Sequence, residues 1–430
     1  MKIVTQAIRR ALQISAVAAA ALVLACTSGN GPSEDVPPVI SGYVIEGIVR
    51  EAATNAPMAF TRVSVTAPGT SRLALTDAGG GFSFTNIVPG TYTIGVDRAG
   101  YDTAGVDVPK GIHDTSFVDL RALRLATVPA AKPQGTGIYR MEGKVVHADL
   151  DGDGIYSLLR VKGAAFSPAP VGSSGGYSTA VMERSFLYLD SLHANTIRTY
   201  SGASAQLLST AHAHGIRVIV GFWVDTQASM SDPGFRRSTV RSFREMVRSL
   251  RSYPAVLFWN LGNEQNLPHV NGDNPLWYDL AEELAVAAFL EEGSAYHPVC
   301  ISNGDMTNIG DPAKRADDAS LRYVDLWASN IYRLDLAPSF AQYRTRTAKP
   351  IVITEFGIDA LDNRTRLEYE GVQMIVDSLN WAQITAASDV CIGGTVFEYT
   401  DEWGKAGDPL LHEYGGYATS QHPDGYSNEE

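Results

Sequence analysis

The sequence predicts an α/β protein, a closed (β/α)8 TIM barrel preceded by a small all-β sandwich. From Ile138 onward, apolar strand-like runs alternate with amphipathic helical segments, and eight such strands can be traced. Between residues 41 and 125, short runs alternate apolar and polar residues between turns, which is typical of antiparallel strands with one buried face. An open, doubly wound sheet is the alternative for residues 138–430. No helix there opens with a glycine-rich phosphate-binding loop, which favours the barrel.

The amino terminus has the pattern of an export signal. Basic residues precede an apolar run over residues 11–25, which is too short to span a bilayer as a mature helix. The run ends in Val-Leu-Ala before Cys26 and resembles a bacterial lipobox, in which the peptide is removed before the cysteine and the thiol carries a lipid. We therefore expect a lipoprotein signal peptide over residues 1–25 and a Gly-, Pro- and Ser-rich tether over residues 26–40. An ordinary signal peptide is the alternative. No aspartate follows Cys26, so the resemblance implies the outer membrane of a Gram-negative bacterium.

The composition limits the partners of the chain. A formal net charge of -13 and a pI near 5.2 argue against nucleic acid or an anionic membrane surface. Contact with a membrane is therefore expected through the lipid anchor only. Cys300 and Cys391 lie in apolar runs, so we expect buried hydrophobic side chains rather than a disulfide. No cofactor is predicted.

The domain order follows from these patterns. The sandwich is expected over residues 41–125, a linker over 126–137 and the barrel over 138–430, where a hairpin-like segment comes first. The sandwich strands are expected at residues 43–50, 61–67, 72–77, 82–88 and 91–97. The barrel strands are expected at 159–166, 195–200, 217–224, 255–264, 297–305, 323–332, 350–357 and 391–400, with helices at 179–193, 205–215, 237–253, 277–292 and 365–383. No segment after residue 400 has the pattern of a closing helix.

Two glutamates follow apolar strands that face each other across the predicted barrel. The fourth strand ends in Asn263 and Glu264, and the seventh ends in Glu355. Active sites of such barrels lie at the carboxyl ends of the strands, so both carboxylates can converge there. A single glutamate at the end of a strand is more often a helix-terminal charge or a loop contact. Two glutamates that both end apolar strands indicate a function, because burying a charged side chain is costly. A pair of carboxyl groups about 5–5.5 Å apart is what retaining glycoside hydrolysis requires.

Polar and aromatic side chains stand at neighbouring strand ends. An arginine and a tyrosine beside Glu355 are expected to keep it ionised, and aromatic faces suit the apolar side of a sugar ring. The candidates for substrate binding are Arg198, Tyr200, Asn263, Tyr332 and Trp403. Three further tryptophans, at positions 223, 259 and 327, leave a sugar platform and ordinary core packing both open, with core packing preferred.

Several of these strand motifs together carry a resemblance to known enzymes. NTIRTYS, SYPAVLFWNLGNEQN, PIVITEFG and GGTVFEYTDEWG resemble the barrel strands of clan A glycoside hydrolases, including family 2 and, more closely, the family 72 β-1,3-glucanosyltransferases. The resemblance implies that Glu264 is the acid/base, that Glu355 is the nucleophile, and that Arg198, Asn263 and Tyr332 support them. It implies a retaining glycoside hydrolase or transglycosylase acting on β-linked glucan or oligosaccharide. The sequence departs from family 72 in lacking cysteine-rich features and from family 2 in its accessory sandwich. A catalytically silent carbohydrate-binding envelope lipoprotein and a structural envelope protein are the alternatives.

The sandwich and the turn that follows it carry two lesser motifs. T-D-x-G-G-G-F-x-F over residues 76–84 and V-P-G-T-Y-T over residues 88–93 resemble carboxypeptidase regulatory-like domains, which implies a spacer or a binding accessory. Asp149, Asp151 and Asp153 alternate as in the opening of a calcium-binding loop. Arg160 stands at the twelfth position where such a loop needs a glutamate, so a plain acidic turn is the favoured interpretation over a metal site.

Overall fold

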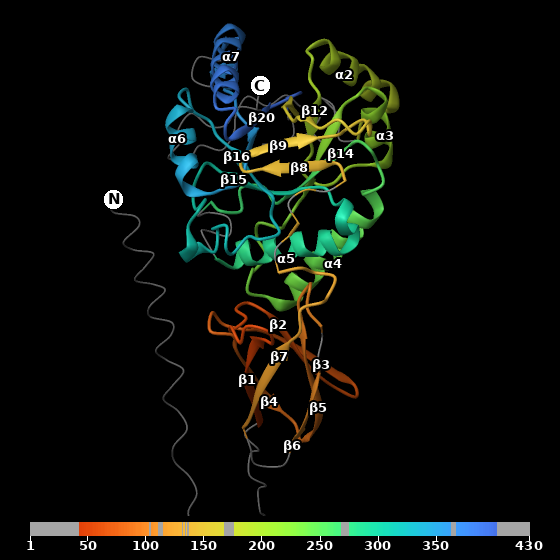
Figure 1. The fold of residues 1–430 in the computed structure, drawn as a ribbon, viewed down its shortest axis with the longest axis vertical. Coiled ribbons are helices and arrows are strands. Elements are labelled where there is room, and N and C mark those ends of the chain that lie inside the picture. The colour runs from red at the N-terminus through yellow and green to blue at the C-terminus, as the bar shows by residue number, and fades with distance from the viewer. Residues whose placement is uncertain are drawn as a thin grey trace, which may run out of the picture. The chain divides into compact units, whose positions relative to one another are not determined.

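A computed structural model gives the fold of residues 43–102, 105–110, 115–130, 132–133, 135, 137–166, 176–267, 275–362 and 367–401. These residues form a β-sandwich and a closed parallel barrel surrounded by helices, as the sequence predicts (Figure 1). The open-sheet alternative is wrong, because the last barrel strand pairs with the first. Among these residues, no helix is long and apolar enough to cross a membrane.

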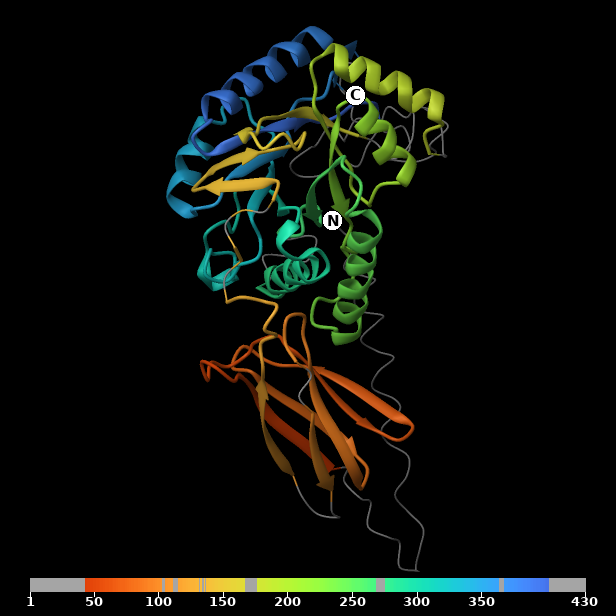
Figure 2. The same cartoon turned by 45° about the vertical axis from the view of Figure 1, so that its right-hand side comes forward.

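The sandwich consists of two sheets that share one hydrophobic core. One sheet has the order β4-β1-β7 and the other β3-β2-β5-β6. Figure 2 shows the strands of the sandwich in red and orange. Alternate residues of the first strand, such as Ile45 and Val49, are fully buried, as the period of two in the sequence predicts. The strands are β1 (Tyr43–Glu51), β2 (Arg62–Ala67), β3 (Thr70–Leu75), β4 (Gly81–Ile87), β5 (Gly90–Asp97), β6 (Val106–Lys110) and β7 (Ser116–Ala122).

The first five of these strands lie close to their predicted positions, whereas β6 and β7 were not predicted. β6 is short, lies at the edge of its sheet and contains Pro109, which has no backbone N–H to donate to a ladder. β7 pairs with β1 in parallel, a contact between residues far apart in the sequence. Local patterns therefore contain little information about either strand.

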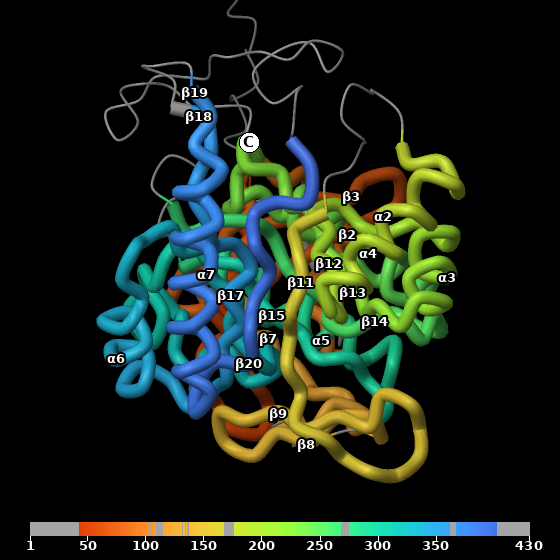
Figure 3. The backbone as a smooth tube through the Cα atoms, turned by 90° about the horizontal axis from the view of Figure 1, so that it is seen from above, coloured from red at the N-terminus to blue at the C-terminus, as the bar shows by residue number. Residues whose placement is uncertain are grey.

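Eight parallel strands close the barrel. Figure 3 shows β11 and β20 side by side, with α6 and α7 on the left and α2 and α3 on the right. Each predicted barrel strand is confirmed. Glu264 follows the fourth strand, and Glu355 is the last residue of the seventh. In barrel order the strands are β11 (Val161–Ala165), β12 (Thr196–Arg198), β13 (Arg217–Phe222), β14 (Val256–Leu261), β15 (Val299–Gly304), β16 (Leu326–Asn330), β17 (Ile351–Glu355) and β20 (Cys391–Val396).

Three of the helices, α2, α3 and α4, begin at side-chain caps that the sequence supplies. Ser178 and Ser204 accept hydrogen bonds from backbone N–H groups in the first turns of α2 and α3, and Asp232 does the same just before the proline that opens α4. The helices are α2 (Thr179–Ser191), α3 (Ala205–Ala213), α4 (Pro233–Leu250), α5 (Pro275–Glu292), α6 (Ala337–Arg346) and α7 (Glu370–Ala386). Of these, α6 was not predicted, because it buries only Ser339, Phe340 and Tyr343 and so lacks a long apolar stripe.

A small sheet closes the amino-terminal end of the barrel. It contains β8 (Tyr139–Glu142), β9 (Val145–Ala148) and β10 (Ser157–Leu158), in agreement with the hairpin expected there. The buried Tyr139 hydroxyl donates to the Leu257 carbonyl at the start of β14, 3.0 Å away. The apolar residues of this small sheet share a hydrophobic core with the barrel interior. Elsewhere, β18 (Leu361–Asp362) and β19 (Leu367–Glu368) form a short hairpin before α7.

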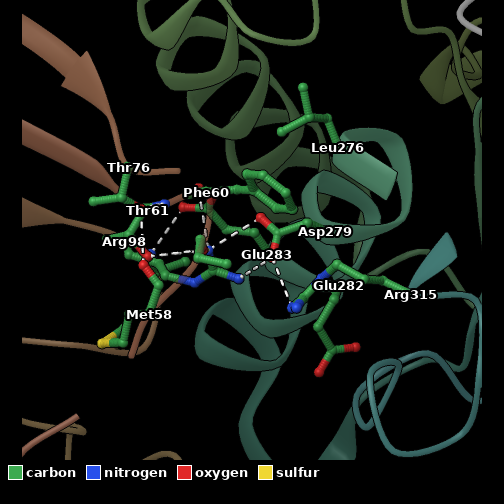
Figure 4. Close-up of polar contacts among 12 residues, drawn as sticks. Met58, Phe60, Thr61, Thr76, Arg98, Leu276, Asp279, Glu282, Glu283 and Arg315 are labelled. Carbon is green, nitrogen blue, oxygen red and sulfur yellow. Dashed lines mark hydrogen bonds and ion pairs between the residues drawn. The ribbon is translucent and has the colours of Figure 1, made fainter. Parts of the chain in front are cut away.

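Buried ion pairs join the sandwich to α5 (Figure 4). The Arg62 guanidinium donates to both carboxylate oxygens of Glu283, at 2.9 and 2.7 Å. Arg98 makes a similar pair of bonds with Asp279, at 3.1 and 3.0 Å. The four guanidinium groups that contact these two carboxylates belong to Arg62, Arg98, Arg236 and Arg315. Paired, bidentate geometry of this kind fixes orientation as well as distance, so the sandwich is held by directional contacts.

The predicted linker also packs against the barrel. The Lys132 ammonium lies 2.5 Å from the Asp325 carboxylate, and the Tyr296 hydroxyl donates to the Pro133 carbonyl at 2.8 Å. Cys300 and Cys391 are buried and not paired with each other, as the apolar runs around them predict.

Candidate active site

The turn after β14 places Glu264 at the carboxyl end of the barrel. Gly262 and Glu264 both adopt left-handed backbone conformations, with φ of 63° and 54°. A Cβ at Gly262 would lie 2.9 Å from the Trp277 ring, so this tight turn requires glycine. The Glu264 N–H donates to the Ser302 carbonyl at 2.9 Å. A left-handed glutamate is an unusual conformation that surrounding contacts must hold, and such residues concentrate at functional sites.

Three donors hold the carboxylate of Glu355. The guanidinium of Arg198 contacts its Oε1 at 2.6 Å, and the Tyr200 hydroxyl donates to the same oxygen at 2.8 Å. The Tyr332 hydroxyl donates to Oε2 at 2.6 Å. Arg198 is fully buried, whereas Tyr332 is 49% exposed and so connects the site to solvent. The three bonds together engage both carboxylate oxygens, so they fix the orientation of the Glu355 side chain.

Asn330 and Asn263 connect this cluster to Glu264. The Asn330 amide donates to Glu264 Oε1 at 3.1 Å and to Asn263 Oδ1 at 3.0 Å. Asn263 Oδ1 also accepts from Arg198 at 2.7 Å. With its oxygen used twice, Asn263 has its NH2 group as the part that can donate to a ligand. The two glutamates thus share one hydrogen-bonded network that starts at the ends of β12, β14, β16 and β17.

Burial and charge fix the protonation states of the two groups behind Glu355. Burial, together with the negative charge of Glu355, raises the pKa of Tyr200 well above its ordinary value, so this tyrosine remains a donor. Burial alone would lower the pKa of Arg198, but the neighbouring Tyr200 and Glu355 outweigh it and raise that pKa. Arg198 therefore stays cationic beside the carboxylate.

The structure brings together most of the residues predicted for the site. Glu264, Glu355, Arg198, Tyr200, Asn263 and Tyr332 all belong to the network. Trp403 and Cys26 lie outside the described residues. Asn330 and the buried Ser302, which Arg198 contacts at 3.2 Å, were not predicted. Both are buried polar residues in the second half of strands that begin with an apolar run, and this was the signal available in the sequence.

The structure separates the three tryptophans for which core packing and a sugar platform were both open. Trp259 and Trp327 are fully buried, as expected for core residues. Trp223 is 46% exposed, directly after the end of β13.

The carboxylate oxygens of Asp149, Asp151 and Asp153 lie within 4.8 Å of one another. Asp149 accepts from the backbone N–H groups of Gly152 and Gly154, as in an acidic turn.

Comparisons with known proteins describe the two domains separately. Residues 44–122 match the family model of the carboxypeptidase regulatory-like domain. No curated protein matches the sequence. Among solved structures, the chain is similar to a GH2 β-galacturonidase from Eisenbergiella tayi, with 16% identity, 84% of this chain and 60% of that chain covered, and a TM-score of 0.49. It is also similar to a β-glucuronidase from Bacteroides uniformis, at 15% sequence identity and a TM-score of 0.48. The match covers 79% of this chain and 42% of that chain.

A β-D-glucuronidase from Dictyoglomus thermophilum is similar at 16% identity, with 84% of this chain and 62% of that chain covered and a TM-score of 0.46. The chain thus spans between 42% and 62% of the length of these three enzymes. The amino-terminal sandwich is carboxypeptidase regulatory-like, as its motifs predict, and it precedes a closed eight-stranded barrel with two linked glutamates at its carboxyl end.

Proposed function

We propose that the chain is a retaining glycoside hydrolase or transglycosylase that acts on β-linked glucan or oligosaccharide. One observation supports this above all. Glu264 follows the fourth barrel strand, Glu355 ends the seventh, and Asn330 and Arg198 link them in one network. A pair of carboxyl groups held at one end of a barrel is the arrangement that double-displacement chemistry at an anomeric carbon needs.

In the first step, the Glu355 carboxylate attacks the anomeric carbon and forms a glycosyl ester while the bond to the leaving oxygen breaks. Glu264 donates its proton to that oxygen, so the leaving group departs as a neutral alcohol. Arg198, Tyr200 and Tyr332 hold Glu355 ionised and fixed in orientation. The NH2 group of Asn263 donates to the sugar 2-hydroxyl, a contact that strengthens in the transition state.

In the second step, water or an acceptor sugar gives its proton to Glu264. The resulting oxygen bonds to the anomeric carbon, the ester bond breaks, and the Glu355 carboxylate is restored. Water gives hydrolysis and a sugar hydroxyl gives transfer. Both outcomes conserve the anomeric configuration because the carbon is inverted twice.

The test is product analysis with β-1,3-, β-1,4- and β-1,2-linked gluco-oligosaccharides, and with an aryl β-glucuronide because the enzymes named above include glucuronidases. We expect the wild type to cleave at least one glucan probe with retention, as read by proton NMR of the first product. Glu264→Gln and Glu355→Gln should each abolish turnover while the far-UV circular dichroism spectrum stays unchanged. Full activity of either variant rejects the assignment, and binding of glucan without cleavage by the wild type supports the silent binding lipoprotein instead.

We further propose that Cys26 carries a lipid that anchors the protein in the outer membrane of a Gram-negative bacterium. The lipobox-like run before Cys26 supports this. Metabolic labelling with a radioactive fatty acid should mark the wild type and not Cys26→Ala. Equal labelling of both proteins contradicts the proposal.

A further inference from the structure

Trp223 directly follows β13, and the alternation of side chains along that strand indicates on which side of the barrel wall it lies. Val220 belongs to the core between the barrel and its helices, and Phe222 packs on that side against Phe243 of α4, with ring centroids 4.9 Å apart. Ile219 instead belongs to the cluster inside the barrel. Successive side chains of a strand point to opposite faces. If this alternation continues one residue beyond β13, Trp223 lies on the same face as Ile219, toward the inside of the barrel.

Two hydrogen bonds hold the Trp223 backbone beside the acid/base segment. The Gly262 N–H donates to the carbonyl of Phe222 at 2.9 Å, and the Gln265 side chain donates to the carbonyl of Val224 at 2.8 Å. Gln265 is fully buried, so it is a fixed anchor. These bonds join the residues on either side of Trp223 to those on either side of Glu264.

The indole of Trp223 is an exposed apolar surface on a backbone that is held in place. It is 46% exposed, while the next residue, Val224, is buried. Scattered exposed aromatics are ordinary on protein surfaces, but this one is tied to the segment that carries Glu264. An indole face suits the apolar C–H face of a pyranose ring.

We propose that Trp223 is the platform for the sugar on the leaving-group side of the scissile bond, an inference that rests on the proposed function. Glu264 protonates the leaving oxygen, so the groups beside Glu264 face the departing sugar, whereas Glu355 faces the anomeric carbon. The same platform then receives the acceptor in the second step. Trp223 therefore selects oligosaccharide leaving groups and favours transfer to sugar over transfer to water.

The test compares two probes that differ in their need for this platform. A gluco-oligosaccharide cleaved by the wild type places a sugar on the leaving-group side, whereas β-glucosyl fluoride places only a fluoride ion there. We expect Trp223→Ala to lower kcat/KM for the oligosaccharide, relative to that for the fluoride, by about three- to tenfold. The ratio of transfer to hydrolysis products should fall in parallel. Trp223→Phe, which keeps a ring, should restore most of both ratios.

Phe117→Ala is the matched control, because Phe117 is a 68% exposed aromatic on the sandwich strand β7. It should change neither ratio, and thermal melting of all three variants should match the wild type. Equal losses on both probes, or no loss, with Trp223→Ala overturn this inference and leave the proposed function standing. Failure of the wild type to cleave any oligosaccharide or the fluoride overturns the proposed function and the inference with it.

Discussion

The Asp279 carboxylate is the common counter-ion of three guanidinium groups, and its removal should destabilise the protein strongly. It accepts two bonds from Arg98 at 3.1 and 3.0 Å, one from Arg236 at 2.6 Å and one from Arg315 at 3.0 Å. Only 1% of Asp279 is exposed, so water cannot replace it. The charges of the arginines outweigh burial and lower the pKa of Asp279.

Asp279→Asn keeps the size of the side chain and removes its charge. Breaking a buried ion pair by removing one partner costs about 3–5 kcal/mol, because the other charge stays buried and unpaired. Here three guanidinium groups lose their shared partner, so we expect a loss in that range. The free energy of unfolding is measured by urea titration at pH 7, with far-UV circular dichroism and tryptophan fluorescence as two probes.

Asp119→Asn is the matched control for this measurement. Asp119 pairs with Arg121 on the sandwich, and both side chains are exposed, at 41% and 47%. Exposed pairs contribute about 0–1 kcal/mol, so this variant should stay close to the wild type. Added salt should weaken the Asp119 pair and leave the Asp279 effect largely unchanged, because buried pairs are screened less. If Asp279→Asn is no more destabilised than Asp119→Asn, the reasoning is refuted.

Two further predictions concern the partly buried Glu282 and the hydrogen bonds to Glu355. Burial raises the pKa of Glu282 from 4.5 to about 7, so the folded state holds its proton where the unfolded state releases it, and stability falls as pH rises through that interval. Glu282→Gln should therefore stabilise the protein at pH 8 by up to about 3 kcal/mol and have little effect at pH 4; an equal change in melting temperature at both values contradicts this. Tyr332→Phe removes one hydrogen bond to the Glu355 carboxylate, and we expect kcat to fall about 10- to 100-fold with unchanged melting. Tyr188→Phe, at an exposed position on α2, is its control, and equal kcat for the two variants excludes a role for the Tyr332 hydroxyl.

The sequence by itself determined the architecture and the main carboxylates. Alternation with period two marked the first five sandwich strands, and apolar runs alternating with helices marked every strand of the barrel. Glu264 and Glu355 stood out because each ends an apolar strand, where a charged side chain is costly without a purpose. These features are local, so they can be read from neighbouring residues.

Only the tertiary structure decided which side chains meet. The hydrogen bond from Asn330 to Glu264 joins residues 66 positions apart in the sequence. The ion pair between Arg62 and Glu283 joins residues 221 positions apart. The exposure of Trp223 depends on which face of β13 is inside the closed barrel, and a short apolar run gives no sign of that. Register, closure and domain contacts arise from packing between distant segments, and their energy is absent from any local pattern.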